Sequence, residues 1–413
     1  MIKPNTRCIC ALFCCLPLYG AAAVELMISA KGEAYLSQTE PNALVNKTWF
    51  NRGTGQLDYA EQAIGLGPQY VAIDALTDSA FSARVHAQWH AKPEAGASVT
   101  EAWLNWAPLP VAGYRLRGRL GYFYPQLSLE NTDTAWTSPY SSTFSAINSW
   151  VAEEVRARGG ELSISRPGRF FNANHSWTGV VGAFQGNDPA GTILAWRGFA
   201  LHNLQTGLGE RVNFARYPSF QVDPLTLQPA WVEPTRELDH RTGYYVGLHW
   251  EHLQQTRVRA YYYDNKGDPL VFRHQQYAWR TRFSSVAIQH VINDDWQLVG
   301  QWLQGDTLMG PSVVAADFTA WFLLAHWQHG ALNATVRYDD FNVDDKDNIP
   351  TDNNSGNGQA MLLALGYSVN DHLNVALEHV RLNSEQQNRQ QQWPWPAKQR
   401  QSVTKLVLTW RWQ

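Results

Sequence analysis

The chain has 413 residues, of which 44% are hydrophobic and only 17% are charged, and its formal net charge is −3. After the first twenty residues it contains no apolar run near the ~18 residues that a membrane-spanning helix needs, so a helical membrane bundle is excluded. The 19 Trp and 17 Tyr argue against wholesale disorder, and the weakly acidic balance gives no reason to expect a nucleic-acid partner.

The beginning of the chain has the features of a secretory signal peptide. Lys3 and Arg7 precede an apolar stretch that is too short to span a bilayer and that ends in three alanines before Val24. The sequence therefore predicts a signal peptide over 1–23 and a single mature domain over 24–413, with a retained membrane anchor as the alternative. All four cysteines lie in the predicted signal peptide, so we expect a mature chain without disulfides.

Apolar and polar residues alternate with a period of two through most of the mature chain. This pattern is typical of β-strands that have one apolar face. It is clear over residues 81–89, 114–122, 244–262, 296–302 and 332–338. Helical periodicity is scarce, so the sequence predicts an all-β protein.

The predicted strands, each about ten residues long, are joined alternately by short turns and long polar segments. The long segments lie near 38–67, 124–158, 204–240, 342–357 and 384–401. Outer-membrane barrels have this arrangement, with short periplasmic turns and long external loops. Because a sheet in lipid cannot leave an unpaired edge, we expect a single closed transmembrane antiparallel β-barrel. Strand counting gives about 17, and because the number should be even we expect 16 or 18 strands.

Tryptophans lie at the ends of the predicted strands, on the same face as the aliphatic residues, as they do in interfacial girdles. They are Trp89, Trp106, Trp250, Trp302, Trp410 and Trp412. The final strand, 402–413, resembles the terminal strand by which barrel proteins of Gram-negative bacteria are recognised for assembly, although Gln413 follows the last tryptophan. This resemblance implies the barrel-assembly machinery as a partner.

One segment inside a long loop predicts a short helix. Over Ile147 to Arg158 the apolar residues fall on one side, and Gly159 and Gly160 are expected to end the helix. Two placements stay open: the helix packs on the outer rim, or the loop folds into the lumen as a constriction, as in general porins.

The polar face of each predicted strand should line the interior of the barrel, and its charges are mostly positive. The inward basic residues are Arg84, Arg115, Arg117, Arg119, Arg257, Arg259, Arg280, Arg282, Arg337, Lys405 and Arg411, and the inward acidic residues are Glu101, Glu251, Asp339 and Glu378. Arginines in a narrow pore raise the local concentration of anions. The sequence therefore favours an anion-preferring pore, in which Arg115, Arg117 and Arg119 form a ladder with a spacing of about 7 Å. In the alternative, these arginines pair with lumen or loop acids such as Glu101, Glu153 and Glu154 and only stiffen the wall.

Motifs for catalysis, cofactors or metals are not apparent in the sequence. His86 and His90 share one strand face about 13 Å apart, which is too far for chelation of one ion. The acidic run 339–352 offers oxygen ligands for Ca²⁺ but lacks the spacing of an EF-hand, so a solvated external loop is the preferred interpretation. We expect neither an enzyme nor a bound cofactor.

Two strands carry a more specific resemblance. The stretch Thr100 to Trp106 (TEAWLNW), followed by Arg117 to Pro125 (RGRLGYFYP), is similar to the group of Gram-negative outer-membrane porins related to phosphate- and polyphosphate-selective channels. The match covers about 98–131 and the last strand. It implies passive diffusion of small solutes, an outer-membrane location and a homotrimer, and it places the family's basic wall residues at Arg115, Arg117 and Arg119. The absence of a lysine cluster departs from the family pattern for phosphate selectivity.

The sequence therefore predicts a channel for small hydrophilic solutes, with a lean toward anions, in the outer membrane. The alternative is a receptor or adhesin barrel that acts through its long external loops. An outer-membrane enzyme and a soluble all-β protein are the remaining hypotheses.

Overall fold

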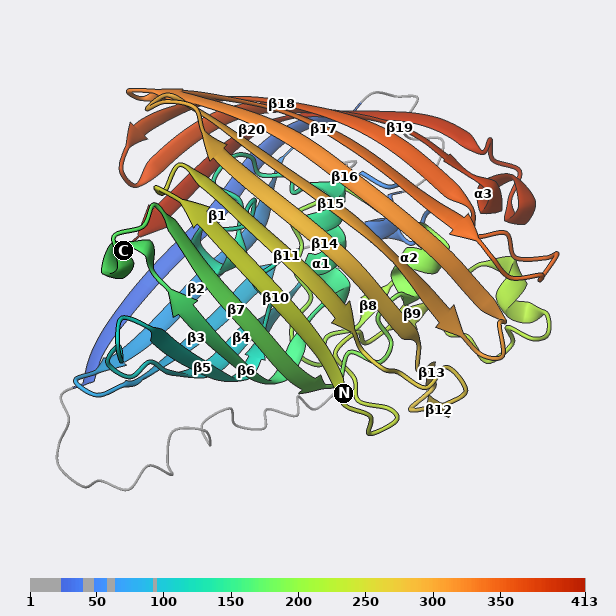
Figure 1. Ribbon diagram of the computed structural model, residues 1–413. Coiled ribbons are helices and arrows are strands. Elements are labelled where there is room, and N and C mark those ends of the chain that lie inside the picture. Colours follow the sequence, from blue (N-terminus) through green and yellow to red (C-terminus); the bar gives the residue numbers. More distant parts are fainter. Residues whose placement is uncertain (1–23, 40–47, 58–63, 92–94, 413) are drawn as a thin grey trace, which may run out of the picture.

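A closed antiparallel barrel dominates this computed structural model, which describes residues 24–39, 48–57, 64–91 and 95–412 (Figure 1). The barrel has sixteen strands, and the first strand pairs with the last to close the ring. The prediction of a closed all-β barrel is confirmed, and of the two expected strand counts 16 is correct. The predicted signal peptide lies outside the described residues, so it stays a prediction.

The barrel strands follow one another around the ring in chain order. They are β1 (Val24–Thr39), β2 (Ile64–Thr77), β3 (Phe81–His90), β4 (Gly96–Trp106), β5 (Arg115–Phe123), β6 (Ala157–Arg166), β7 (His175–Gln185), β10 (Gly243–His252), β11 (Thr256–Asp264), β14 (Arg280–Val291), β15 (Trp296–Met309), β16 (Val314–His329), β17 (Leu332–Asp345), β18 (Gly356–Asn370), β19 (Leu373–Gln386) and β20 (Lys398–Trp412).

The other elements lie in the connections. Two small sheets pair β8 (Val212–Asn213) with β9 (Trp231–Val232) and β12 (Phe272–Arg273) with β13 (Gln276–Tyr277). The α-helices are α1 (Ala146–Glu154), α2 (Thr192–Arg197) and α3 (Gln387–Gln392), and the 3-10 turns are η2 (Trp49–Asn51), η3 (Thr134–Trp136), η4 (Gly168–Phe171) and η5 (Pro218–Gln221). No helix in the described part of the chain is long and apolar enough to cross a membrane.

Long and short connections are sorted to opposite ends of the barrel. Turns such as 78–80, 253–255 and 330–331 lie at what we call the short-turn end, whereas α2, α3 and the two small sheets gather at the long-loop end (Figure 1). In outer-membrane barrels the short turns face the periplasm. The expected alternation of connection lengths is therefore present.

The outward face of the barrel is apolar. On β18, Met361, Leu363 and Leu365 are 51%, 43% and 51% exposed, whereas the alternate residues Ala360 and Leu362 are buried. Two cross-strand tryptophan pairs mark the edges of this band on β15 and β16: Trp302 opposite Trp321, and Trp296 opposite Trp327. The pairs are about 20 Å apart along the strands. This outer face suits contact with lipid hydrocarbon, with aromatic residues at its borders.

The inward face of the strands from β14 to β20 is also largely apolar, contrary to expectation. Its buried members include Phe283, Leu303, Phe318, Phe322, Leu324, Leu362, Leu382 and Val403. Trp150 of α1 packs against this wall, with ring centroids 5.4 Å from Phe283 and 5.3 Å from Phe318. The prediction that the inward faces line a water-filled lumen is therefore wrong for much of this half of the barrel, because protein occupies the interior there.

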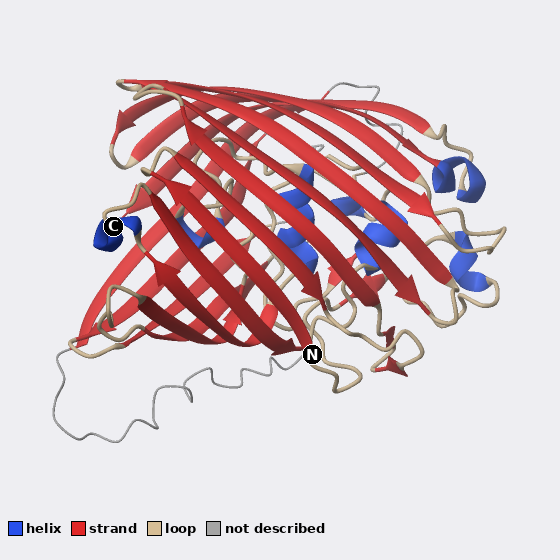
Figure 2. Cartoon of the chain, in the orientation of Figure 1, coloured by secondary structure: helices blue, strands red, loops and turns tan. Residues whose placement is uncertain are grey.

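Two chain segments occupy the interior. We call residues 124–156 the first internal segment and 186–207 the second; they contain α1 and α2, which lie within the outline of the barrel (Figure 2). Every residue of 143–156 and of the second segment is buried. Of the two placements left open for the predicted helix, the lumen is therefore correct. Residues 193–202 belong to the second internal segment and form none of the barrel strands.

The predicted helix and α1 begin at nearly the same residue, but α1 ends earlier than predicted. The helix begins where the Ser145 hydroxyl accepts a hydrogen bond from the Asn148 amide. It ends at Glu154, because Val155 is extended and β6 starts two residues later. Gly159 and Gly160, expected to terminate the helix, lie inside β6 instead.

Candidate functional site

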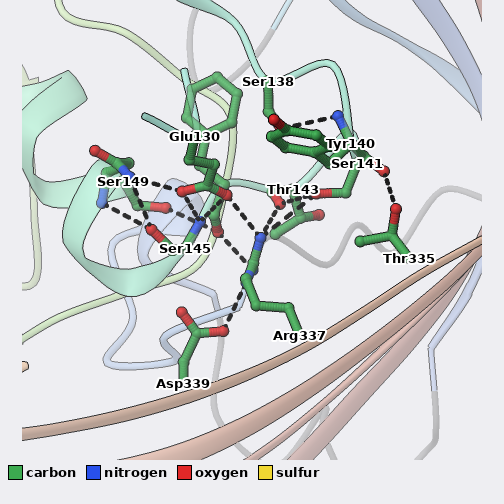
Figure 3. Close-up of polar contacts among 12 residues, drawn as sticks. Glu130, Ser138, Tyr140, Ser141, Thr143, Ser145, Ser149, Thr335, Arg337 and Asp339 are labelled. Carbon is green, nitrogen blue, oxygen red and sulfur yellow. Dashed lines mark hydrogen bonds and ion pairs between the residues drawn. The ribbon is translucent and has the colours of Figure 1, made fainter. Parts of the chain in front are cut away.

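Arg337 fixes the first internal segment to the barrel wall (Figure 3). Its guanidinium donates to Glu130 Oε1 at 2.9 Å and to the carbonyl oxygens of Thr143 and Phe144, both at 2.8 Å. It also donates to Asp339 Oδ2 at 2.8 Å, and the other oxygen of Asp339 accepts the Ala146 amide at the start of α1. All three charged side chains are buried. Arg337 faces inward as expected, but it binds protein rather than lining a water-filled space.

Strands near the closing seam hold the same segment. Lys31 of β1 donates to Asp133 Oδ2 at 2.9 Å, and Arg411 of β20 reaches the same oxygen at 3.1 Å. Glu378 of β19 accepts from the amides of Ser142 and Thr143. Arg411 and Glu378, which were expected to face inward, therefore serve as anchors, together with Lys31, which the sequence analysis did not single out.

The second internal segment is bound in the same way. Arg197 donates to both carboxylate oxygens of Glu153 on α1, and His202 lies 3.2 Å from the same carboxylate. Arginine and histidine hold the pKa of Glu153 at about 2, although burial alone raises the pKa of a carboxyl group. The carbonyl of Arg197 accepts from Gln386 of β19. The internal segments thus form one body that is tied to the wall.

The remaining wall, from β3 to β7, carries the predicted arginine ladder. Trp103 points inward from β4, and the guanidinium carbons of Arg84, Arg117 and Arg119 lie 5.5, 5.6 and 5.7 Å from its ring centroid. Three cations from β3 and β5, the two strands that flank β4, therefore share one aromatic ring. This arrangement offsets part of their mutual repulsion.

Acidic residues neutralise some of these arginines. Arg84 forms a two-pronged ion pair with Asp74 of β2. Arg119 is buried and donates to both oxygens of Glu161 on β6, at 2.8 Å each. Glu101, also expected inward, is buried beside His86, with 2.8 Å between oxygen and nitrogen. The alternative in which arginines pair with acids therefore describes Arg84 and Arg119.

Arg115 and Arg117 differ from their neighbours. Both are exposed, and among the described residues no carboxylate forms an ion pair with either. Arg117 donates to the Asn105 side chain, and the Arg115 guanidinium lies 5.4 Å from the Phe170 ring centroid. Both line a cavity of about 490 Å³ at the short-turn end, together with Ala107, Pro108, Pro110, Leu116, Gln126, Glu161, Ser163, Ser165, Thr178, Val180 and His249.

The other predicted residues of β10 and β11 border this region. Arg257 lies 3.5 Å from Glu251, and both are partly exposed. Arg259 donates to the carbonyl oxygens of Gln126 and Ser128, so it supports the first internal segment.

Three predicted site residues lie elsewhere. Arg280 and Arg282 share the outward face of β14 with Val286 and Ile288, and Arg282 pairs with Asp306 at 2.7 Å. Their predicted inward orientation is wrong, because the inward positions of this strand are Thr281, Phe283, Ser285 and Ala287. Lys405 of β20 does face inward, but it is buried, 5.9 Å from the Tyr35 ring centroid.

Sequence reasoning missed several residues of the arginine wall. Asp74 lies in a strand with weak alternation, so its orientation was not predicted. Glu161, Ser163 and Ser165 follow the predicted helix directly, and no strand was predicted for them. The alternation of Leu162 and Ile164 with these polar residues was the signal that could have assigned them to a strand.

The acidic run 339–352 does not form one external loop. Asp340, Asp344 and Asp345 belong to β17, and Asp352 is buried, where its carboxylate accepts from Ser219 and Trp196. Asp188 of the second internal segment and Glu237 and Asp239 of the loop before β10 each place one carboxylate oxygen within 4.8 Å of the others, but backbone amides donate to oxygens of all three.

No family model and no curated sequence matches this chain. Solved structures do. An anion-selective porin from Comamonas acidovorans superposes with a TM-score of 0.54 and 11% identity, covering 94% of this chain and 100% of that one. The outer-membrane channel DcaP of Acinetobacter baumannii gives 0.54 and 9%, covering 95% and 97%. OmpT, an outer-membrane protein of Vibrio cholerae, gives 0.51 and 8%, covering 95% and 99%.

The fold is that of the outer-membrane porins. At these identities the likeness concerns the fold alone. Together with the apolar outer band and its tryptophan borders, it supports the location in the outer membrane of a Gram-negative cell that the sequence predicts.

Proposed function

We propose that this protein is an outer-membrane channel through which small hydrophilic solutes diffuse passively, with a preference for anions. The observation that carries the proposal is the pair Arg115 and Arg117, which line a cavity of about 490 Å³ and lack an acidic partner among the described residues. Uncompensated guanidinium groups in a low-dielectric wall attract anions and exclude cations. The anion selectivity named for the Comamonas porin, which shares the fold, agrees with this preference.

Reversal potentials in planar bilayers under a KCl gradient test the proposal. The wild type should prefer chloride, and the double variant Arg115→Gln/Arg117→Gln should shift the reversal potential toward zero or toward cations. Arg282→Gln, which removes a cation from the outward face, is the matched control and should leave selectivity unchanged. A wild type that prefers potassium would overturn the proposed anion preference.

A second candidate function is a receptor or adhesin that acts through the external loops. The observation that favours it is the pair of internal segments, which fill the interior beside β14 to β20 and are anchored from several strands. A plugged receptor barrel should be nearly silent in single-channel recordings, whereas a channel should show discrete conductance steps.

The proposal includes the chain's partners. We infer contact with outer-membrane lipid through the apolar band, recognition by the barrel-assembly machinery through β20, and assembly as a homotrimer. A trimer form is named for OmpT of Vibrio cholerae, which shares the fold. Native mass spectrometry of the detergent-extracted protein tests the trimer, and the mass of the mature chain tests cleavage before Val24.

A further inference from the structure

The cavity that contains Arg115 and Arg117 also presents a row of hydroxyl groups. Ser163 and Ser165 lie on β6 and Thr178 on β7, all facing inward. Strand pairing places Arg117 opposite Ser163 and Arg115 opposite Ser165, and Ser165 is opposite Thr178. Guanidinium groups therefore lie directly beside hydroxyl groups on one continuous wall.

These hydroxyl groups have hydrogen-bonding capacity left for a ligand. Ser165 and Thr178 share one hydrogen bond of 2.8 Å, and Ser163 makes a long one of 3.4 Å to the Arg117 carbonyl oxygen. A hydroxyl group can donate once and accept twice, so each of the three retains at least one free acceptor position. All three are partly exposed to the cavity.

The inner end of the cavity is closed by an acid that is already neutralised. Both oxygens of Glu161 accept from Arg119, and one also accepts from the Tyr245 hydroxyl at 2.8 Å. The Glu161 carboxylate would repel a second acid group on a ligand, whereas it would not repel the ligand's hydroxyl groups. Apolar residues also line the cavity: Pro108 and Pro110 in the turn between β4 and β5, and Val180 on the wall opposite Ser163.

We propose that this cavity binds small hydroxylated organic anions with a single acid group, such as a sugar acid, from the short-turn end. The acid group lies between the Arg115 and Arg117 guanidiniums, and the ligand hydroxyls bond to Ser163, Ser165 and Thr178. A cavity of about 490 Å³ is large enough for such a molecule. This inference rests on the proposed function, because it names the class of anion that the same arginines select.

Isothermal titration calorimetry of the detergent-solubilised full-length barrel tests this, with gluconate, hexanoate and inorganic phosphate as probes. Gluconate and hexanoate have equal carbon chains and differ in hydroxyl groups. Because a site with hydrogen-bonding groups discriminates against a ligand that leaves them unpaired, gluconate should bind about tenfold or more tightly than hexanoate. It should also bind more tightly than phosphate.

Variants separate the two parts of the site. Arg115→Gln/Arg117→Gln should weaken gluconate binding at least about tenfold, as expected for loss of charge-assisted hydrogen bonds. Ser163→Ala/Thr178→Val should abolish the preference for gluconate while changing hexanoate affinity less than about threefold. Arg282→Gln, on the outward face, controls for general effects of charge removal and should bind like the wild type.

The outcomes distinguish this inference from the proposed channel. Equal binding of gluconate and hexanoate, tighter binding of phosphate, or unchanged binding in the double arginine variant would overturn the inference. Anion-selective conductance without gluconate binding would overturn the inference and leave the channel standing. Gluconate binding in a protein that conducts no ions would support the site and overturn the channel.

Discussion

Arg337 on β17 and Glu130 in the first internal segment form a buried ion pair, with 2.9 Å between Nη1 and Oε1, although 207 residues separate them in the chain. Asp339 completes the cluster from the same strand. One guanidinium therefore pairs with two buried acids and donates to carbonyl groups of a segment that lies outside the sheet. This cation is one of several wall residues that hold the first internal segment.

Replacement of Arg337 by Leu should therefore loosen the first internal segment. The substitution leaves Glu130 and Asp339 buried without a cation, a loss of about 3–5 kcal/mol. We expect a lower urea midpoint in tryptophan fluorescence and a larger, noisier single-channel conductance. Arg282→Leu breaks an exposed pair with Asp306 instead, which should cost about 0–1 kcal/mol. Equal behaviour of the two variants would show that the anchor does not hold the segment.

Arg119 and Glu161 should be strongly coupled, because their two-pronged ion pair is buried. Arg119→Gln and Glu161→Gln should each destabilise the barrel by about 3 kcal/mol, since each leaves one buried charge unpaired. The double variant should lose much less than the sum of the two. Equilibrium unfolding in urea measures all four proteins, and additive losses would contradict the coupling.

The stability of the loop around Asp188 should decrease as the pH rises. Burial, together with the charges of Asp239 and Glu237, raises the pKa of Asp188 to about 7, although it accepts the Leu238 amide. Because the folded pKa lies above the unfolded value, this stabilisation is complete below about pH 4 and is lost as the pH passes through 7. Hydrogen exchange, corrected for intrinsic rates, should show the Leu238 amide less protected at pH 8 than at pH 5. Asp188→Asn should remove that difference, so its persistence in the variant would contradict this assignment.

Gly182 of β7 should tolerate no side chain. A Cβ there would lie 2.1 Å from Cζ of Tyr245, which covers the glycine from β10 and donates to Glu161. Gly182→Val should displace the ring and cost about 1–3 kcal/mol as an overpacked site. Gly179→Val, on the outward face of the same strand, meets only the Ile164 side chain at 3.8 Å and serves as control. Thermal unfolding followed by circular dichroism should separate the two.

The barrel could be predicted because period-two alternation is a direct result of strand geometry. The apolar residues of β10 and β17, for example, could be assigned to the outward face from the sequence alone. The interior could not be assigned in the same way. On β16, Phe318 and Phe322 face inward, so both faces are apolar and alternation is lost as a guide.

The arginine wall was predicted in part for a related reason. Arg115, Arg117 and Arg119 alternate with outward Leu116 and Leu120, so their orientation follows from the pattern. Which of them has an acidic partner depends on the neighbouring strand and its register. Glu161 is 42 residues from Arg119, and no local signal connects the two.

From the apolar inner wall of β14 to β20 we expect an order in the assembly of this protein. Without α1 in the interior, Phe283, Phe318 and Leu362 on the inward face of these strands would be exposed to water, while the outward face of the same strands contacts lipid. Lys31 and Arg411, from the first and last strands, both donate to Asp133, so the first internal segment contacts both sides of the closing seam. We expect the first internal segment to enter the barrel before β1 pairs with β20. A chain lacking 124–156 should therefore remain an open sheet and should not form a closed barrel with an unoccupied interior.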